Sequence, residues 1–388
     1  MSMIDSKEKT DSNDDSTQPV LVMDLIRSIL DRLSFADFCR ARCISSDWYS
    51  ASKSSIRGIT NPWLIFFPKV YGEIKNDTCK FFNPRDNNFY TVRDQRFDFA
   101  WSYYFASSGS WFLMYQNRIL HLLNVFTRER IPLPSLESLD GSEVIVMRKN
   151  SFVIYATLDY KGKDRRNNGD FLAYHKSGDN NNNESWKVLQ HLKKNEGCVD
   201  MVFNESKLYV LRVTRRVTVF DFSGGDSPME CASYPSPMEC ASFKSRDDDV
   251  RFSNNLAVTL SGEVLIISGR VEYPWINFQH FRRSGTTSGR YFFNMYKLDP
   301  KSSEWRIIES LGEEALLLDQ GITVAAQGGV VKNCIYFSNG KLHGYDGYKD
   351  ANGICNCVYN IKTKKMFKVF EHLTASDARW FFPTFGGE

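Results

Sequence analysis

The chain has 388 residues, of which 42% are apolar and 14% aromatic, so it can bury a large core and has room for two or three domains. Its 49 basic and 46 acidic residues give a formal charge of +3, which argues against the strong surface field of a nucleic-acid-binding or membrane-surface protein. We therefore expect no nucleic acid and no membrane among its partners. Nine scattered cysteines without a secretory signal favour a reducing compartment, the cytoplasm or the nucleus or both.

Residues 1–18 form an acidic leader, with five acidic residues against two lysines. Transit peptides avoid acids and signal peptides need an apolar run, so we predict a disordered tail. Farther along the chain, no apolar stretch approaches the 18 or more residues of a membrane span.

Residues 19–57 show the apolar spacing of short helices. The first helix is predicted from one broad apolar stripe, formed by Leu21, Leu25, Ile29, Leu30 and Leu33. Ser34 and Asp37 then give an S-x-x-D start signal for a second helix that contains Phe38. Ile44 and Trp48 mark a third apolar patch at helical spacing.

A unit of about forty residues buries little surface by itself. The unit nevertheless carries many leucines and isoleucines, two phenylalanines and a tryptophan. Part of this apolar surface should therefore contact a partner protein. The alternative is that the helices only cover the neighbouring domain.

The segment Leu21–Phe38, followed by Arg40-Ala41-Arg42 and Trp48, resembles an F-box, most closely the F-boxes of a large plant family. The matching positions are Leu21, Asp24, Leu25, Ile29, Leu30, Leu33, Asp37, Phe38 and Trp48. The chain departs from the pattern at Val22, where the family usually has a proline that contacts a Skp-type adaptor, and at Ser45, where cysteine is common.

The resemblance implies that this helical segment binds a Skp-type adaptor and, through it, a cullin. The implied contact residues are Leu21, Val22, Leu25, Ile29, Leu30, Leu33, Phe38, Ile44 and Trp48.

Residues 62–388 change to short aromatic and β-branched runs that are separated by Asn, Asp, Gly and Ser clusters. This pattern predicts an all-β domain. The clearest strands are expected at 143–146, 152–157, 207–213, 217–222, 263–268 and 334–337.

A repeat appears when the strand ends are aligned on an apolar residue followed by a polar turn starter. It occurs at Phe82-Asn83, Leu123-Asn124, Tyr174-His175, Phe220-Asp221, Leu298-Asp299 and Tyr359-Asn360. Most intervals fit the period of roughly 40 to 50 residues that is typical of kelch-like and other propeller blades. We predict a β-propeller of about five to seven blades, closed by an aromatic terminal strand near Arg379–Phe385.

One of the longer intervals between these repeats contains a duplication, because Ser227–Ser233 recurs as Ser236–Ser242. Its two prolines and acidic neighbours suggest a tolerated loop insertion without a binding role.

The same plant family carries a kinase-interacting-type propeller after its F-box, and the resemblance spans nearly the whole chain. It rests on the segments 61–68, 127–134, 309–316 and 380–383, together with Trp305.

Catalytic and cofactor motifs are missing from the sequence. The six histidines form no H-E-x-x-H pair, Cys355-x-Cys357 has no second pair at zinc-site spacing, and no Walker loop or dinucleotide fingerprint occurs. We therefore expect no catalytic residue, no metal site and no cofactor. The pairs Arg215-Arg216 and Arg282-Arg283 have the chemistry to grip an acidic or phosphorylated partner, but solvated hairpin tips explain them more simply, and we favour that interpretation.

These features favour a substrate-recognition adaptor of a Skp-cullin-F-box ubiquitin ligase, in which the propeller binds a client protein that the sequence does not identify. The alternative is a binding module that sequesters or inhibits a partner such as a kinase. A propeller enzyme with a site in its central channel is a third class, and it would need convergent acids, histidines or a metal.

Overall fold

The computed structural model describes residues 23–53, 61–68, 76–85, 87–117, 119–134, 142–148, 152–158, 171–176, 186–191, 197–224, 228–237, 250–272, 290–338, 356–368 and 377–383. The chain divides into two compact units. The first comprises Met1–Gly58 with Gly386–Glu388, and the second comprises Ile59–Phe385. Within the described residues, no helix is long and apolar enough to span a bilayer.

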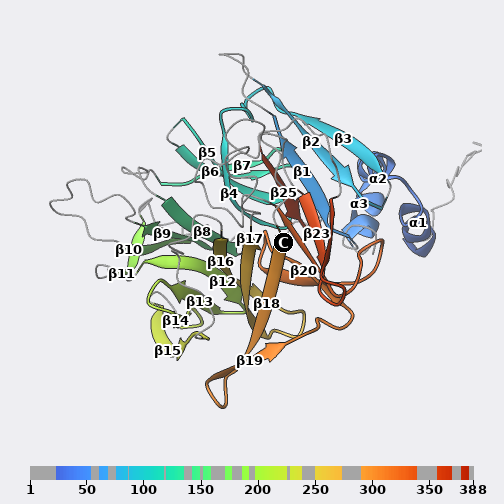
Figure 1. Ribbon diagram of the computed structural model, residues 1–388. Coiled ribbons are helices and arrows are strands. Elements are labelled where there is room, and N and C mark those ends of the chain that lie inside the picture. Colours follow the sequence, from blue (N-terminus) through green and yellow to red (C-terminus); the bar gives the residue numbers. More distant parts are fainter. Residues whose placement is uncertain are drawn as a thin grey trace, which may run out of the picture. The chain divides into compact units, whose positions relative to one another are not determined.

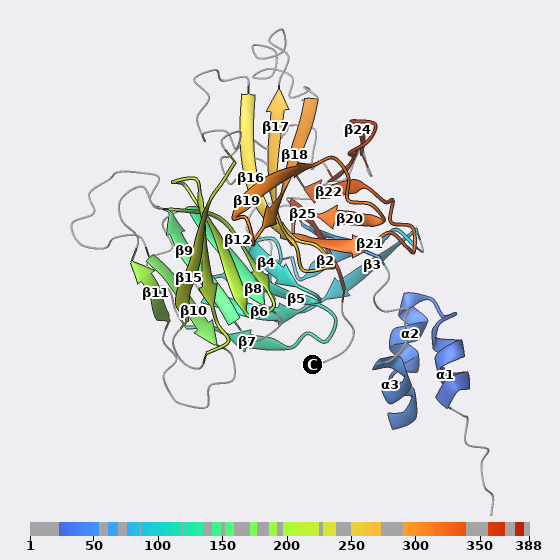
Figure 2. The same ribbon diagram turned by 90° about the horizontal axis from the view of Figure 1, so that it is seen from below.

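The described part of the first unit contains three short helices, α1 (Met23–Leu30), α2 (Phe35–Ala41) and α3 (Ser46–Lys53). The predicted start signal of the second helix is present, because Ser34 Oγ accepts a hydrogen bond from the Asp37 amide at 3.2 Å. Helix α1 packs against α3, as Figure 2 shows. The buried apolar side chains of the three helices are Ile26, Leu30, Phe38, Ala41 and Ala51.

The described strands of the second unit form five sheets (Figure 1). One sheet has the order β25-β1-β2-β3, with β25 Asp377–Phe381, β1 Trp63–Phe67, β2 Thr78–Asn83 and β3 Asn88–Arg93. A second has the order β4-β5-β6-β7, with β4 Tyr103–Ser108, β5 Trp111–Gln116, β6 Ile119–Asn124 and β7 Arg130–Pro132.

Two further four-stranded sheets follow along the chain. The first contains β8 (Ser142–Arg148), β9 (Phe152–Leu158), β10 (Phe171–Lys176) and β11 (Lys187–His191). The second contains β12 (Cys198–Asn204), β13 (Lys207–Arg212), β14 (Arg216–Asp221) and β15 (Met229–Pro235).

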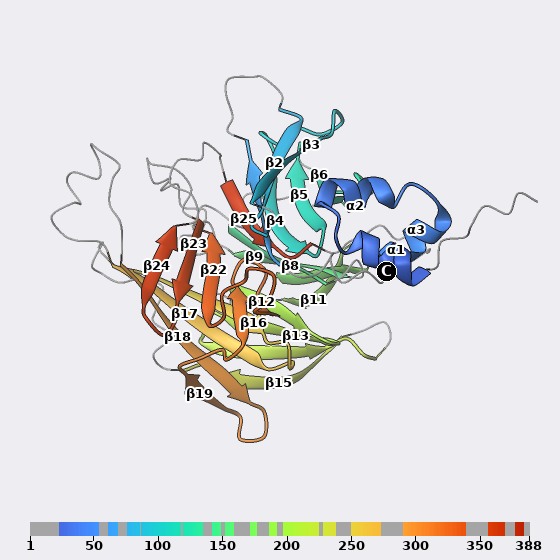
Figure 3. The same ribbon diagram turned by 90° about the vertical axis from the view of Figure 1, so that its right-hand side faces the viewer.

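The fifth sheet is nine-stranded, with the order β19-β18-β17-β16-β21-β20-β22-β23-β24. Its strands are β16 (Val250–Val258), β17 (Val264–Glu272), β18 (Arg290–Asp299), β19 (Glu304–Ile308), β20 (Glu314–Leu317), β21 (Ile322–Ala325), β22 (Cys334–Ser338), β23 (Asn356–Asn360) and β24 (Lys365–Lys368). Figure 3 shows β22, β23 and β24 side by side at one end of this sheet.

The sheets pack on one another in chain order. The ring of Phe67 in β1 lies 5.9 Å from that of Tyr104 in β4. Strand β4 then contacts β8, β8 contacts β12, and β12 contacts β16. At the far end of the nine-stranded sheet, β22 contacts β25, which belongs to the first sheet. This cyclic series of contacts is the arrangement of a β-propeller.

The terminal strand completes the cyclic series of contacts between the sheets, as the sequence predicts. Strand β25 pairs antiparallel with β1 along its whole length, from Trp63 opposite Phe381 to Phe67 opposite Asp377. Ala378, Trp380 and Phe381 are fully buried there. The described part of this segment therefore joins the two ends of the propeller sequence within one sheet.

The predicted repeat is confirmed at the ends of β2, β6, β14, β18 and β23, where Asn83, Asn124, Asp221, Asp299 and Asn360 begin a turn. Each side-chain oxygen accepts a backbone amide two or three residues later, for example Arg85 N at 3.0 Å from Asn83 Oδ1. Four turns then place the residue four positions after the starter at positive φ, namely Asn87, Arg128, Ser303 and Lys364. Such turns lead into the outermost strand of each sheet.

The six strands predicted most clearly from the sequence are confirmed as β8, β9, β13, β14, β17 and β22, although the predictions at 207–213, 217–222 and 263–268 each extend one residue beyond the strand. The prediction of a loop across the first copy of the duplication is wrong, because Met229–Pro235 forms the edge strand β15 and pairs with β14. Most of the second copy lies outside the described residues.

Candidate functional site

Part of the predicted adaptor-binding set lies on the surface of the helical unit. Leu25 is 55% exposed, Ile29 39% and Ile44 63%, and Tyr49 of α3 is also exposed. Leu25 and Ile29 are four residues apart, so both project from one face of α1. Large apolar side chains that are exposed on one helix face make this surface a candidate for protein binding.

The other predicted contact residues are placed differently. Leu30 and Phe38 are buried, and Leu33 and Trp48 are partly buried. Leu21 and Val22 lie outside the described residues. The apolar stripe that the sequence shows on the first helix thus has two sides, since Leu30 points inward while Leu25 and Ile29 are exposed.

Sequence reasoning did not single out Ile26, which is buried with Leu30 one turn later on α1. The four-residue spacing of Ile26 and Leu30 was the signal that could have identified the inner face of this helix. Tyr49, which follows Trp48 of the third apolar patch, was likewise not singled out, and the Arg42 guanidinium lies over its ring at 5.3 Å.

Charged groups accompany these apolar residues on the helices. Arg27 Nη1 lies 3.0 Å from Asp24 Oδ1, and Arg40 Nη1 lies 2.8 Å from Asp37 Oδ1. Hydrogen bonds from Ser34 and Arg40 lower the pKa of Asp37. The helical unit therefore combines exposed apolar side chains with exposed polar ones, as the core and the rim of a protein interface do.

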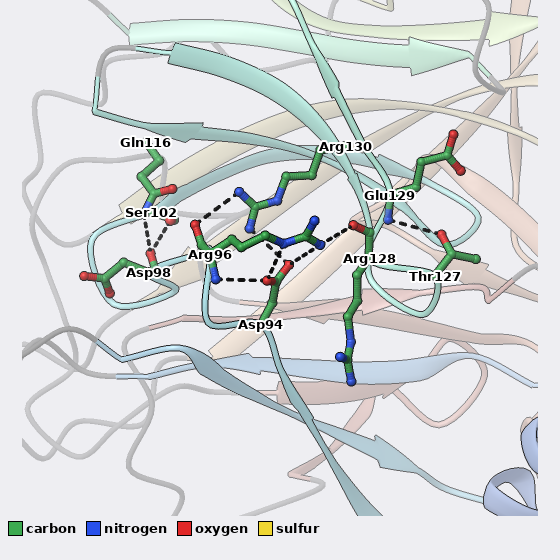
Figure 4. Close-up of polar contacts among 9 residues, drawn as sticks. All are labelled: Asp94, Arg96, Asp98, Ser102, Gln116, Thr127, Arg128, Glu129 and Arg130. Carbon is green, nitrogen blue, oxygen red and sulfur yellow. Dashed lines mark hydrogen bonds and ion pairs between the residues drawn. The ribbon is translucent and has the colours of Figure 1, made fainter.

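In the second unit, a cluster of polar side chains centres on Asp94, which begins the connection between β3 and β4 (Figure 4). Two arginines converge on its carboxylate: Arg96 Nε donates to Oδ1 at 3.1 Å and Arg130 Nη2 donates to Oδ2 at 3.0 Å. Arg96 and Arg130 are also linked, because Arg130 Nη1 donates to the Arg96 carbonyl at 3.2 Å. The Arg96 guanidinium donates in turn to the Arg128 carbonyl at 3.0 Å.

The Asp94 carboxyl is almost fully buried, which by itself would raise its pKa. Hydrogen bonds from Arg96 and Arg130 outweigh this effect, and the pKa of Asp94 is lowered. The cluster links the turn before β7 to the connection between β3 and β4, which contains the exposed Trp101. Its geometry is that of a structural clamp between two sheets.

His121 lies next to this clamp, in β6. Its ring centroid is 5.2 Å from that of Phe97, and the Arg130 guanidinium lies over the same phenylalanine ring at 4.9 Å. Burial and the neighbouring Arg130 lower the pKa of His121 to about 4. The imidazole is therefore neutral at physiological pH, and its Nε2 has no hydrogen-bond partner among the described residues.

Across the described part of the chain, no group of three or more His, Cys, Asp or Glu side chains is arranged to hold a metal ion.

Comparison with known proteins gives matches over both units. Residues 20–60 match the family model "F-box domain", and residues 81–360 match the family model "KIB1-4 beta-propeller".

Three relatives from Arabidopsis thaliana align along nearly the whole chain. "F-box protein KIB4" is 49% identical over 426 residues, which cover 99% of this chain and 100% of the relative. "F-box protein KIB2" is 49% identical over 413 residues, with 100% of this chain and 88% of the relative covered. "F-box/kelch-repeat protein KIB1" is 46% identical over 405 residues, with 99% and 96% covered.

Proposed function

The chain belongs to the plant F-box proteins that carry a KIB1-4 β-propeller, and from this premise we propose that it is the substrate-recognition adaptor of a Skp-cullin-F-box ubiquitin ligase. One observation supports the proposal most directly. The F-box helices leave Leu25, Ile29 and Ile44 exposed, although a unit this small needs its apolar residues for its own core. A Skp-type adaptor that covers these side chains would complete their burial.

The mechanism divides the work between the two units. The helical unit binds the Skp-type adaptor and thereby a cullin, while the propeller binds the client protein. The chain then acts by raising the local concentration of the client near the ubiquitin-charged conjugating enzyme. No covalent step is assigned to any residue of this chain.

We assign the domains as residues 19–57 for the F-box and 62–388 for the propeller, preceded by the leader at 1–18. We also infer six blades. The described turns that lead into an outermost strand follow β2, β6, β14, β18 and β23, β11 is the outermost strand next to β10, and the nine-stranded sheet contains both β18 and β23. The nine-stranded sheet thus counts as two blades that are joined by β20 and β21.

The second candidate function is that of a binding module that sequesters or inhibits a partner, for example a kinase, without ligase recruitment. Val22 favours it, because a valine stands where F-boxes usually have the proline that contacts the adaptor. In either role, we propose that the chain acts in the cytoplasm, the nucleus or both.

Affinity purification from plant cells tests the choice between the two roles. The full chain and a variant without residues 19–57 are compared for recovery of Skp-type adaptor and cullin. We expect the full chain to recover both proteins and the deletion variant to recover neither, while client proteins are retained by both chains. Recovery of clients without adaptor by the full chain would favour sequestration.

A further inference from the structure

The connection between β3 and β4, residues 94–102, exposes aromatic side chains together with the start of β4. Trp101 is 51% exposed, and Tyr103, the first residue of β4, is 59% exposed. Tyr103 lies opposite Tyr115 of β5, and the centroids of their rings are 6.3 Å apart. Tryptophan and tyrosine are enriched among the residues that contribute most to binding in protein interfaces. These side chains are therefore candidate contact residues for a partner protein.

This connection is anchored to the sheets on both of its sides. Phe99 is buried, and its amide donates to the Asn76 carbonyl, just before β2, at 2.8 Å. On the other side, Gln116 of β5 donates through Nε2 to the Asp98 carbonyl at 3.3 Å (Figure 4). A side chain that is positioned before a partner arrives loses less conformational entropy on binding. The anchored connection thus prepares Trp101 for contact with a partner.

The same region places arginines outside and carboxylates inside. Arg93, the last residue of β3, donates through Nε to Asp77 Oδ2 at 2.8 Å, and the arginine side chain is 66% exposed against 21% for the aspartate. Arg96 is equally exposed, whereas Asp94, to which it donates, is buried. An ion pair with the cation outside and the anion inside presents donor groups to the solvent, since each guanidinium has five N–H donors.

Arg128 adds a third exposed guanidinium group. Arg96 Nη2 donates to the Arg128 backbone carbonyl at 3.0 Å, and the Arg128 side chain is exposed. Within residues 93–103 and 127–130, three exposed arginines therefore stand against one exposed acidic residue, Glu129. Guanidinium groups bind carboxylates through parallel N–H donors. The charge of this surface is complementary to that of an acidic partner.

We propose that the surface formed by Trp101, Tyr103, Arg93, Arg96 and Arg128 binds an acidic segment of the client protein that also contains large apolar side chains. The apolar side chains pack on the aromatic rings, and the carboxylates pair with the surrounding guanidinium groups, as in the core and the rim of an interface. The inference rests on the proposed role of the propeller as the client-binding unit.

Fluorescence anisotropy with the full chain and two labelled peptides tests the proposal. One peptide has a pair of leucines between two runs of glutamate, and the other has lysine in place of every glutamate. We expect the chain to bind the glutamate peptide at least about tenfold more tightly, because exposed guanidinium groups attract carboxylates and repel ammonium groups. Equal affinity for the two peptides, or no binding of the glutamate peptide, would overturn the proposal.

Matched variants identify the surface that binds. Trp101→Ala should weaken binding of the glutamate peptide at least about tenfold, as the loss of a central aromatic contact does, whereas Phe367→Ala, at a comparably exposed position of β24, should not. Arg93→Gln should weaken binding about threefold, in the range of an exposed ion pair. Its control is Arg306→Gln, because Arg306 is also exposed and paired with an aspartate. If each variant binds like its control, the peptide binds elsewhere and the proposal is wrong.

The melting temperatures of these variants should equal that of the unmodified chain, since all four side chains are exposed. Should Trp101→Ala fail to fold, Tyr103→Ala takes its place with the same expected loss, and unchanged affinity in that variant would overturn the proposal. The measurement needs no adaptor. A chain that recovers no Skp-type adaptor would therefore lose the ligase role and keep this surface, whereas unchanged peptide binding in Trp101→Ala would remove this surface and keep the ligase role.

Discussion

Trp380 of β25 lies opposite Leu64 of β1, in the antiparallel pairing that joins the end of the propeller sequence to its beginning. The indole is 1% exposed, and its ring lies 5.1 Å from that of Tyr336 in β22, in an edge-on arrangement. One side chain therefore contacts both the first strand of the unit and the sheet that precedes the closure.

We predict that Trp380→Ala lowers the free energy of unfolding by about 3–5 kcal/mol, because a fully buried indole leaves a large cavity. Urea denaturation of the full chain measures the change. Trp101→Ala is the matched control: Trp101 is 51% exposed, so its loss should change the stability by no more than about 0.5 kcal/mol. Equal effects of the two variants would contradict the closing role of β25.

The placement of Leu25 and Leu30 on different sides of α1 separates binding from folding. Leu25→Ala and Ile29→Ala should each weaken adaptor binding by about thirtyfold, the equivalent of about 2 kcal/mol for one buried leucine or isoleucine side chain. The melting temperature should be unchanged. Ser28→Ala, at an exposed position of the same helix, serves as the control for binding.

Leu30→Ala should instead destabilise the helical unit, by about 2–5 kcal/mol, because Leu30 is fully buried. Binding of a Skp-type adaptor and thermal unfolding are measured on all four variants. If Leu25→Ala and Ile29→Ala bind as well as the unmodified chain, these exposed side chains do not form the interface.

Val22 offers a gain-of-function test. If the proline contact implied by the F-box resemblance operates here, Val22→Pro should strengthen adaptor binding, measured by calorimetry against the unmodified chain. When neither chain binds a Skp-type adaptor, the ligase role is replaced by the sequestering one.

The Asp94 clamp should be a major contributor to the stability of the propeller. Asp94→Ala leaves Arg130, whose side chain is mostly buried, without its carboxylate, and breaking such a pair costs about 3–5 kcal/mol. Glu313→Ala removes an exposed ion pair with Lys332 and should cost less than about 1 kcal/mol. Denaturant midpoints of the two variants decide whether Asp94 differs from a surface charge.

The lowered pKa of His121 predicts that the protein loses stability in mild acid. This pKa is about 4 in the folded chain and has its ordinary value of 6.5 in the unfolded chain, so the unfolded chain binds more protons between these pH values. Stability should therefore be fully present above pH 6.5 and decline as the pH falls toward 4, by a total of about 3 kcal/mol from this group. The variant His121→Phe should lose this part of the pH dependence, and an identical slope in both chains would contradict the assignment.

Local chemistry explains which parts of the fold could be predicted from the sequence. A turn that begins at Asn83 or Asp299 depends on hydrogen bonds to amides two or three residues later, so the local sequence contains the groups that form the turn. The terminal strand was predictable from its aromatic residues. The helices of the first unit were predictable from apolar spacing and from the Ser34 start signal.

The features that could not be predicted depend on contacts between residues that are far apart in the sequence. Asp94 and Arg130 are 36 residues apart, and nothing local to either residue indicates their contact. Leu25 and Leu30 belong to one apolar stripe in sequence, but only the packing of α1 against α3 decides which of them is buried. Strand β15 was mistaken for a loop because its polar composition is compatible with an edge strand only when β14 is there to pair with it.

The pairing of β25 with β1 also sets the order of events during synthesis. Strand β1 leaves the ribosome long before β25, by on the order of tens of seconds at roughly 5–20 residues per second. Throughout that time, the edge of β1 that β25 will occupy is unpaired, and the apolar residues Trp63–Phe67 lack part of their cover. The nascent chain therefore exposes an unpaired, aggregation-prone sheet edge until β25 is synthesised, and we expect chaperones to bind it during this time.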